Sequence, residues 1–390
     1  MKLLFLLPRH NLDLMRGDSV YSRRMLEGLV EAENEVHAIA HGSSKKIFVH
    51  SPGKPRLFRR VYLMPYTNYL KLIKLNELLK KHEFDLVINQ NFIVFGENGW
   101  FSIPQLFERR NSLHGMLLKK ITEKHSVPLL YKINGMTERN SFVPFYAGET
   151  REIHLKQLKE SQGIIMLSKK QKELLEGENI RNKFFVFYPS LDTKKFKKIE
   201  NCNYIKKKFG LNDFNLLFFS ASHPANEMRS FFSVLSKTEK EINLVMNCGE
   251  SRELNELINE FGLRERVKFI GKVKEEDLVP LMSYCKAGVY LKKFALPIAD
   301  ASTIVKISEY MACSLPILIP EMSGPIEQMG EAGIVMDENA VEKINELYYS
   351  ESLRKKLEKK AREKAEKEFD LEKNSKRLSE FFEGIAGERR

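Results

Sequence analysis

Short apolar runs of strand length recur along this chain, and most of them are followed by a segment whose apolar residues have helical spacing. The first unit joins a strand at KLLFLL, a loop over residues 8–19, a helix over residues 20–33 and a second strand at EVHAIA. Such alternation is typical of a parallel α/β sheet, in which ligands bind beyond the carboxyl ends of the strands. The loop is too long for a dinucleotide-binding turn, and it contains no G-x-G-x-x-G motif.

The remaining runs form two groups, separated by a lysine-rich polar segment around residues 191–211. Before it lie DLVIN, PLLYKIN, GIIMLS and FFVFYP; after it lie NLLFFSAS, INLVMNCG, RVKFIGKV, AGVYLK and LPILIP, with helices beginning near Glu253, Glu275 and Thr303. A chain of 390 residues is long enough for two domains with separate cores. We therefore expect an α/β protein with two Rossmann-like domains at 1–190 and 191–368, followed by a C-terminal helix at 369–390.

The stretch ASTIVKISEYMACSLPILIP, residues 301–320, constrains function most. Small and hydroxyl residues, Ser302 and Thr303 among them, precede a helix that ends at Ser314 before the strand at 317–319. A helix start capped by a hydroxyl is a natural anion site. Lys306 and Glu309 lie one turn apart and could serve a phosphate and a sugar hydroxyl. An ordinary capped helix with a surface Lys–Glu pair has the same pattern, so the pattern alone leaves both interpretations open.

KISEYMACSLPILI, residues 306–319, resembles the K-I-x-E-Y-M-A-x-G-K-P-V-I signature of GT-B glycosyltransferases of family four, the glycosyl transferases group 1. FFSASHPANEMRSF, residues 218–231, resembles a loop of the branch that carries small residues before K-I-x-E-Y-M-A. The resemblance implies the GT-B architecture, with two parallel sheets facing across a cleft. It also implies an acceptor-binding first domain, a second domain that binds a nucleotide sugar, and a last helix that crosses back to the first domain.

The resemblance assigns site residues in both domains. It implies donor-binding roles for Gly17, Ser222, His223, Asn226, Ser302, Thr303, Lys306 and Glu309. No Lys-Gly pair follows the loop at residues 222–229, so Arg229 or Lys306 must neutralise the donor diphosphate, and we assign both catalytic roles. Asn134 is the third catalytic assignment. It stands where the family usually has a histidine near the transferred sugar, and it can donate a hydrogen bond but cannot shuttle a proton.

Several positions depart from the family pattern. Ala301 stands where many relatives have the first of two glutamates, Ser314 replaces a glycine, Ile304 replaces an arginine, and Asp18 replaces a second glycine after Gly17. A variant sugar pocket would account for these departures. A non-catalytic GT-B scaffold protein in cell-envelope glycan assembly would account for them too, so it stays as the alternative. A nucleotide-sugar epimerase is a weaker one, because it needs a general-base constellation that the sequence does not offer.

The resemblance implies a retaining transfer from a UDP- or GDP-linked sugar to a lipid-linked, polysaccharide or protein-linked glycan acceptor, through an oxocarbenium-like state without a covalent enzyme nucleophile. We expect no cofactor besides this co-substrate and no metal. The chain has no Asp-x-Asp motif, and its four cysteines are widely scattered. Helix N-termini and basic side chains would then stabilise the leaving diphosphate.

The net charge of +12 lies almost entirely in the first half, where residues 1–190 carry 30 Lys and Arg against 19 Asp and Glu. Residues 42–76, the basic stretch, contain no acid and eight basic residues: Lys45, Lys46, Lys54, Arg56, Arg59, Arg60, Lys71 and Lys74. Interleaved apolar residues make an anionic membrane surface a partner of suitable chemistry, whereas a solvated insertion is the other interpretation. We expect no nucleic-acid partner.

The opening MKLLFLLPRH has a short apolar core but no small-residue cleavage pattern, so Leu3 to Leu7 read as a buried strand and not as a signal peptide. No apolar run approaches the roughly 18–20 residues that a membrane helix needs. Scattered cysteines favour reduced thiols in a cytoplasm. We therefore expect a cytoplasmic protein that associates peripherally with the inner face of the plasma membrane.

Overall fold

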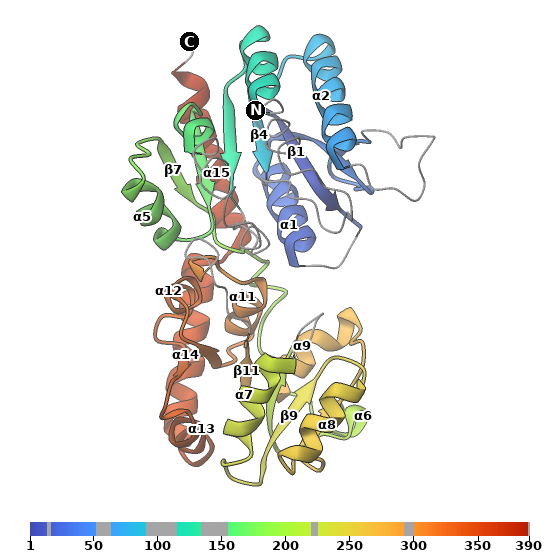
Figure 1. The fold of residues 1–390 in the computed structure, drawn as a ribbon, viewed down its shortest axis with the longest axis vertical. Helices are drawn as coiled ribbons and strands as arrows, with labels where there is room; N and C mark the ends of the chain where they lie inside the picture. Colours follow the sequence, from blue (N-terminus) through green and yellow to red (C-terminus); the bar gives the residue numbers. More distant parts are fainter. Residues whose placement is uncertain are drawn as a thin grey trace. The chain divides into compact units, whose positions relative to one another are not determined.

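The computed structural model describes residues 1–13, 17–51, 64–90, 115–133, 155–219, 225–291 and 300–388. The chain divides into two compact units (Figure 1). The first unit comprises Met1–Tyr188, Leu296–Ser302 and Leu371–Arg390; the second comprises Pro189–Ala295 and Thr303–Asp370. The predicted domain boundaries after residues 190 and 368 fall within two residues of the divisions after Tyr188 and Asp370.

The first unit is built on a parallel sheet whose described strands follow the order β3-β2-β1-β4-β5-β6-β7. Its strands are β1 (Lys2–Asn11), β2 (Glu35–His41), β3 (Phe48–His50), β4 (Leu86–Gln90), β5 (Leu129–Lys132), β6 (Gly163–Met166) and β7 (Lys183–Val186). Its helices are α1 (Gly17–Glu31), α2 (Met64–Lys81), α5 (Lys169–Gly177) and α15 (Leu371–Gly387), and residues 115–124 and 155–159 are also helical. The central strands are apolar on both faces because helices cover both faces of a parallel sheet.

Helix α15 belongs to the first unit although it is the last element of the chain, and Figure 1 shows its red ribbon among the blue and green elements of that unit. It packs against α1 so closely that a Cβ on Gly28 would lie 2.2 Å from the Ser375 hydroxyl. The Asn34 amide donates a hydrogen bond of 3.0 Å to Ser379 Oγ, and Phe381 packs on Phe185 of β7. The predicted return of the last helix to the first domain is therefore confirmed.

The second unit repeats the same strand order with one strand fewer among the described residues, β10-β9-β8-β11-β12-β13, again all parallel. Its strands are β8 (Phe214–Phe218), β9 (Ile242–Met246), β10 (Val267–Phe269), β11 (Ala287–Val289), β12 (Ile317–Pro320) and β13 (Gly333–Met336). Its helices are α6 (Tyr204–Phe209), α7 (Ala225–Leu235), α8 (Arg252–Glu260), α9 (Glu275–Tyr284), α11 (Val305–Ala312), α12 (Ser323–Met329), α13 (Ala340–Tyr349) and α14 (Glu351–Glu368).

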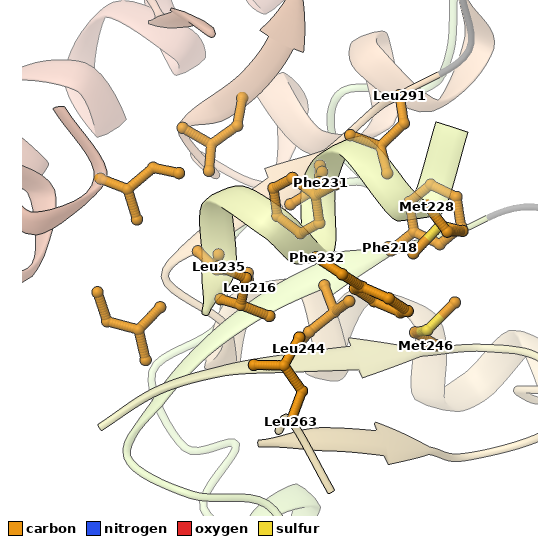
Figure 2. Packing of buried hydrophobic residues seen from close by; sticks show 14 of the residues in the cluster. Leu216, Phe218, Met228, Phe231, Phe232, Leu235, Leu244, Met246, Leu263 and Leu291 are labelled. Atoms are coloured by element: carbon orange, nitrogen blue, oxygen red, sulfur yellow. The ribbon is translucent and has the colours of Figure 1, made fainter. Parts of the chain in front are cut away.

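The core of the second unit forms where α7 lies on its sheet. Figure 2 shows Phe231, Phe232 and Leu235 of α7 over Leu216 of β8 and Leu244 of β9. These side chains are almost fully buried, and truncating a buried phenylalanine to alanine typically costs about 3–5 kcal/mol. This packing holds the carboxyl ends of β8 and β11 in place, which is the edge at which ligands bind in such sheets.

The predicted elements differ from the observed ones mainly at their ends. Strand β1 continues through Asn11, where the sequence predicted a loop from Pro8, and α1 begins at Gly17, three residues before the predicted start. Helix α11 begins at Val305, two residues after the predicted start at Thr303. Two short strands, β3 and β13, were not predicted. Every strand that the sequence did predict is present within a few residues of its expected position.

Candidate functional site

Helix α11 follows the carboxyl end of β11 and starts without a hydroxyl cap. Its N-cap residue is Ile304, whose backbone N–H donates to Gln328 Oε1 at 2.7 Å. The same buried amide donates from Nε2 to the Ile304 carbonyl at 2.9 Å and to Ser308 Oγ at 2.8 Å. The predicted hydroxyl cap is therefore wrong, because a glutamine of α12 caps the helix in its place.

Two small residues just before α11 form hydrogen bonds with other residues of the first unit. Ser302 Oγ accepts a hydrogen bond of 3.0 Å from Gln171 Nε2 of α5, and Ser168 Oγ donates to the Ala301 carbonyl at 2.5 Å. Ser168 also caps α5 by accepting the N–H of Gln171. Ser302 and Thr303 are both buried. A donor-binding role for these two hydroxyl residues stays a prediction, and for Ser302 it would require sharing a hydroxyl that already accepts a bond.

Lys306 and Glu309 form an ion pair on the first two turns of α11, with Nζ and Oε2 2.6 Å apart. The Glu309 side chain is 4% exposed and that of Lys306 is 32% exposed, so the pair has a buried acidic end and an accessible basic end. The Lys306 ammonium also lies 4.7 Å from the centre of the Phe219 ring, at the end of β8. The sequence predicted the shared face of Lys306 and Glu309, and the structure adds the aromatic ring that supports the lysine.

Tyr310 joins α11 to the strand edge. Its hydroxyl donates to the Leu217 carbonyl at 3.1 Å and accepts the Phe219 N–H at 3.3 Å. Burial raises the pKa of Tyr310 far above its usual range, so the hydroxyl keeps the proton that it donates. The ring fits because residue 288 is glycine: a Cβ there would lie 2.4 Å from Tyr310 Cδ2. Tyr310 thus fixes the backbone at Leu217 and Phe219, and the Phe219 ring in turn supports the Lys306 ammonium.

The end of α11 explains one departure from the family pattern. Ser314 has a φ of 56°, in the left-handed region where glycine is favoured. Its N–H donates to the Met311 carbonyl at 3.0 Å, and the next N–H, of Leu315, donates to the Tyr310 carbonyl at 2.9 Å. A serine can adopt this conformation at a cost of roughly 1–2 kcal/mol. Ser314 therefore keeps the turn that a glycine would make, without changing the helix before it.

The other predicted site residues are not brought to the Lys306–Glu309 pair by any described contact. Arg229 is exposed on α7, forms an ion pair with Glu260 of α8, and lies 5.9 Å from the centre of the Phe261 ring. Gly17 is the first residue of α1 and Asn226 the second residue of α7, and only their backbones are described. Ser222, His223 and Asn134 lie outside the described residues. Their roles stay predictions.

The carboxyl edge of the first sheet holds a lysine of a different kind. Lys132 ends β5, is fully buried, and places Nζ 4.1 Å from the centre of the Tyr21 ring. Tyr21 donates its hydroxyl proton to the Phe187 carbonyl at 2.8 Å, and Gln90 Nε2, at the end of β4, donates to Ser22 Oγ at 2.5 Å. Sequence reasoning treated Lys132 as part of an apolar run. The signal that it missed is a charge at the last residue of a central strand.

The basic stretch is only partly available to a surface. Lys71 is buried and donates to the Leu7 carbonyl at 3.3 Å, so counting it among the surface charges was wrong. Lys46 pairs with Glu31 and Lys74 with Glu77, both at exposed positions where such pairs are weak. Lys45 is exposed, and so are the apolar Phe48 and Ile73. Lys54, Arg56, Arg59 and Arg60 lie outside the described residues.

Two kinds of feature are absent from the described residues. No group of three or more His, Cys, Asp or Glu side chains among them is arranged to hold a metal ion. In the same part of the chain, no helix combines the length and the apolar character that crossing a bilayer requires. The four cysteines, all described, are buried free thiols.

Residues 225–364, which make up most of the second unit, match the family model described as Glycosyl transferases group 1. No curated protein matches the chain by sequence. Among solved structures, sucrose-phosphate synthase from Thermosynechococcus elongatus is similar with a TM-score of 0.73, 14% identity, and coverage of 100% of both chains. HepE from Anabaena in complex with UDP-glucose is similar with a TM-score of 0.69 and 16% identity over 98% of this chain and 100% of that chain.

A protein from Listeria monocytogenes, named as a candidate UDP-N-acetylglucosamine 2-epimerase, is similar with a TM-score of 0.62 and 13% identity over 99% of this chain and 97% of that chain. At such identities a structural likeness establishes the fold. The predicted pair of Rossmann-like parallel-sheet domains of GT-B type is therefore confirmed.

Proposed function

We propose that this chain, in which residues 225–364 match the model of the glycosyl transferases group 1, moves a sugar from a nucleoside diphosphate sugar to a glycan or lipid-linked acceptor with retention of configuration. The family match over residues 225–364 and the fold support a glycosyltransferase activity; its donor, acceptor and stereochemistry are further parts of the proposal. One observation carries it: the Lys306–Glu309 pair stands on the helix that follows β11, at the carboxyl edge of the second sheet.

The pair suits a nucleoside diphosphate because its two ends differ in exposure. A carboxylate held by Lys306 at 2.6 Å can accept further hydrogen bonds, as the two hydroxyls of a ribose require. The ammonium, supported by Phe219, can meet the diphosphate as charge develops on the leaving group. We propose that Glu309 binds the ribose and that Lys306 neutralises the diphosphate.

A uridine base is the first choice for the donor. The similar HepE structure contains UDP-glucose, which supports a UDP-linked sugar over a GDP-linked one. We propose a metal-independent transfer through an oxocarbenium-like state, in which Asn134 contributes a hydrogen-bond donor and no proton shuttle. Arg229 would have to leave Glu260 in order to reach a diphosphate, so Lys306 is the main cation of the proposal.

Thermal shift with UDP, GDP and ADP tests the donor, because a ligand that binds only the folded state raises apparent stability by mass action. We expect UDP to give the largest shift. The variant Glu309→Ala should keep the fold and lose on the order of 1–3 kcal/mol of UDP binding. Unchanged UDP affinity in folded Glu309→Ala would show that the ribose is bound elsewhere.

Hydrolysis or transfer from a UDP-sugar separates the transferase from the non-catalytic scaffold of the same fold. A protein that binds UDP but releases no sugar from a panel of UDP-sugars, with and without lipid-linked acceptors, would favour the scaffold. An interconversion of the free nucleotide sugar to its 2-epimer would favour an epimerase. We expect slow hydrolysis in water and faster turnover with an acceptor.

We also propose that the first unit meets an anionic membrane surface through the basic stretch. Support comes from the exposed Lys45, Phe48 and Ile73 and from the four cations of the undescribed part. Each cation near such a surface contributes roughly 1 kcal/mol, an attraction that salt screens. Co-sedimentation with anionic but not with neutral vesicles, abolished by high salt, is the expected result. Equal binding to anionic and neutral vesicles would contradict an electrostatic membrane role. It would not affect the proposed sugar transfer.

A further inference from the structure

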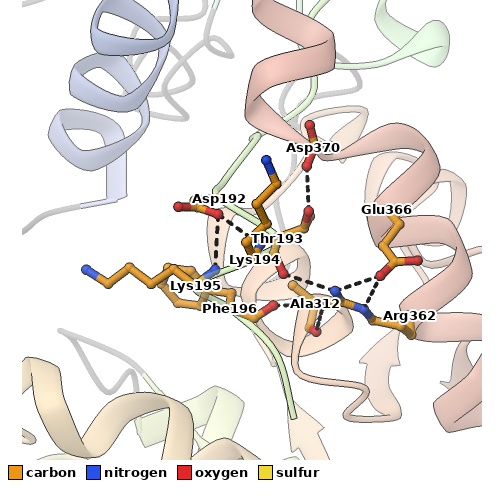
Figure 3. A network of polar contacts seen from close by, with 9 residues as sticks. All are labelled: Asp192, Thr193, Lys194, Lys195, Phe196, Ala312, Arg362, Glu366 and Asp370. Carbon is orange, nitrogen blue, oxygen red and sulfur yellow. Dashed lines mark hydrogen bonds and ion pairs between the residues drawn. The ribbon is translucent and has the colours of Figure 1, made fainter. Parts of the chain in front are cut away.

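Arg362 of α14 gathers backbone carbonyls from two distant parts of the second unit. Figure 3 shows its guanidinium beside the end of α11 and the linker at residues 191–196. Nη1 donates to the Ala312 carbonyl at 2.6 Å and to the Phe196 carbonyl at 2.8 Å, and Nη2 donates to the Thr193 carbonyl at 3.0 Å. Nε donates to Glu366 Oε1 at 2.7 Å, which orients the guanidinium plane.

The bond to Ala312 falls at the end of the helix that carries the proposed donor site. Ala312 is the last residue of α11, and the final carbonyls of a helix have no partner within it. A cation at this end also interacts favourably with the helix dipole. Because α11 has only two turns, a contact at its last carbonyl constrains the whole helix.

Arg362 also lies close to Cys313, the residue that follows α11. The N–H of Cys313 donates to the Glu309 carbonyl at 3.2 Å, so Cys313 reports on the same turn. The pKa of the Cys313 thiol is raised to about 12, mainly by burial; Glu309 acts in the same direction, whereas Arg362 and Lys306 act in the opposite one. The guanidinium therefore lies within electrostatic range of the turn that holds the Glu309 carboxylate.

The linker gives Arg362 a fixed support. The Leu191 N–H donates to the Phe369 carbonyl at 2.9 Å. Figure 3 shows the second bond, in which Thr193 Oγ1 donates to Asp370 Oδ2 at 2.5 Å. Asp192 Oδ1 accepts the N–H groups of Lys194 and Lys195. The linker is thus bonded to residues 369–370 near its start and to itself around Asp192, and the guanidinium joins this segment to α11.

We propose that Arg362 is a positioning residue, which holds the C-terminal end of α11 against the linker and so keeps Glu309 and Lys306 in the geometry that binds the nucleoside diphosphate. This inference rests on the proposed function. Without the guanidinium, α11 loses its bond to the linker, and the carboxylate loses a fixed orientation although no ligand-contacting group has been removed.

Arg354 supplies a matched control on the same helix. Its Nη1 donates to the Leu347 and Tyr348 carbonyls at 2.7 and 2.6 Å, in the last turn of α13. Arg354 therefore binds carbonyls at the end of α13 as Arg362 binds the last carbonyl of α11, but α13 does not carry the Lys306–Glu309 pair. The experiment compares Arg362→Gln, Arg362→Lys and Arg354→Gln in the full chain, by thermal unfolding and by UDP titration calorimetry.

We expect Arg362→Gln and Arg354→Gln to lower thermal stability by similar amounts, since each removes bonds to helix-end carbonyls. Only Arg362→Gln should weaken UDP binding, by about tenfold, which is about 1.4 kcal/mol. Arg362→Lys keeps the charge but not the forked donors, so its UDP affinity should lie between those of the unaltered protein and Arg362→Gln. If the glutamine variant fails to fold, the lysine variant still tests the role by comparison with the unaltered protein.

Equal UDP affinity in the unaltered protein and in folded Arg362→Gln or Arg362→Lys would overturn the positioning role and leave the proposed function intact. An equal affinity loss in Arg354→Gln would also overturn it, because general destabilisation would then explain the effect. Absence of UDP binding by the unaltered protein would overturn the proposed function itself, and this inference with it.

Discussion

The two sheets share one strand order, yet the lysines near the carboxyl ends of their strands differ in how far they are buried. Lys132 of the first sheet is fully buried over the Tyr21 ring. Lys306 of the second is 32% exposed over the Phe219 ring and is bound to a buried carboxylate. Both are cations over aromatic rings, but only the second has its charge at an accessible position. Burial and not topology thus separates a lysine that serves the fold from one that can serve a ligand.

Lys306→Met is the strongest test of this difference. Methionine keeps the apolar stem over Phe219 and removes the charge. A charge-assisted interaction contributes roughly 1.5–3 kcal/mol, so we expect about 30-fold weaker binding of UDP and little change for uridine, which has no diphosphate. Calorimetry with both ligands measures the ratio. Equal losses for UDP and uridine would mean that Lys306 acts on the helix and not on the phosphates.

Lys132→Met should give the opposite outcome. The change removes a fully buried ammonium and leaves its polar surroundings with fewer partners, at a cost of about 1–3 kcal/mol in the free energy of unfolding. UDP affinity should stay within about twofold of the unaltered protein. Urea unfolding and calorimetry on the same sample check both. A stable Lys132→Met protein with impaired UDP binding would break the distinction between the two sheets.

The tyrosines beside these lysines allow a finer comparison. Tyr21 and Tyr310 each donate a buried hydroxyl proton to a backbone carbonyl, of Phe187 and Leu217 respectively. Tyr21→Phe and Tyr310→Phe should each lower the free energy of unfolding by about 1 kcal/mol. Because Tyr310 also fixes Phe219 under Lys306, Tyr310→Phe alone should weaken UDP binding by a few-fold. Identical binding by the two variants would show that the β8 end needs no such anchor.

Ser314→Gly should have the smallest effect, and in the stabilising direction. Glycine adopts the left-handed conformation of residue 314 without steric cost, so we expect a gain of about 0.5–1 kcal/mol in stability. UDP affinity should not change, since the turn itself is already formed. A gain in affinity together with stability would mean that the serine does perturb the donor site.

The sequence predicted the sheets well because their central strands are fully buried apolar runs. It missed β3, which has only three residues, none of them buried: the bond between His37 Nδ1 and His50 Nε2, 2.8 Å long, helps to hold it. It also missed β13, whose residues are only partly buried. The end of β1 moved because Asn11 pairs with His41 of β2 beyond a register irregularity after Leu6, a pairing that only the neighbouring strand defines.

The candidate site was predictable where it depends on helical spacing and not where it depends on contacts between elements. Lys306 and Glu309 are one turn apart in any helix, so their pairing followed from the sequence. The Gln328 cap and the Arg362 contacts come from α12 and α14, and no local pattern indicates them. Arg229 is a further example, because its partner on α8, Glu260, is also set by tertiary packing.

The place of α15 has a consequence for the order in which the protein is made. The first unit opens the chain, but it lacks its covering helix until residues 371–387 are synthesised. The second unit needs nothing beyond Asp370. Domains generally fold as they emerge from the ribosome, N-terminal ones first. Here we expect the sequence of events to reverse: the second unit reaches its native core while the first still waits, with the surface around Gly28 and Gly163 open, for the final helix to leave the exit tunnel.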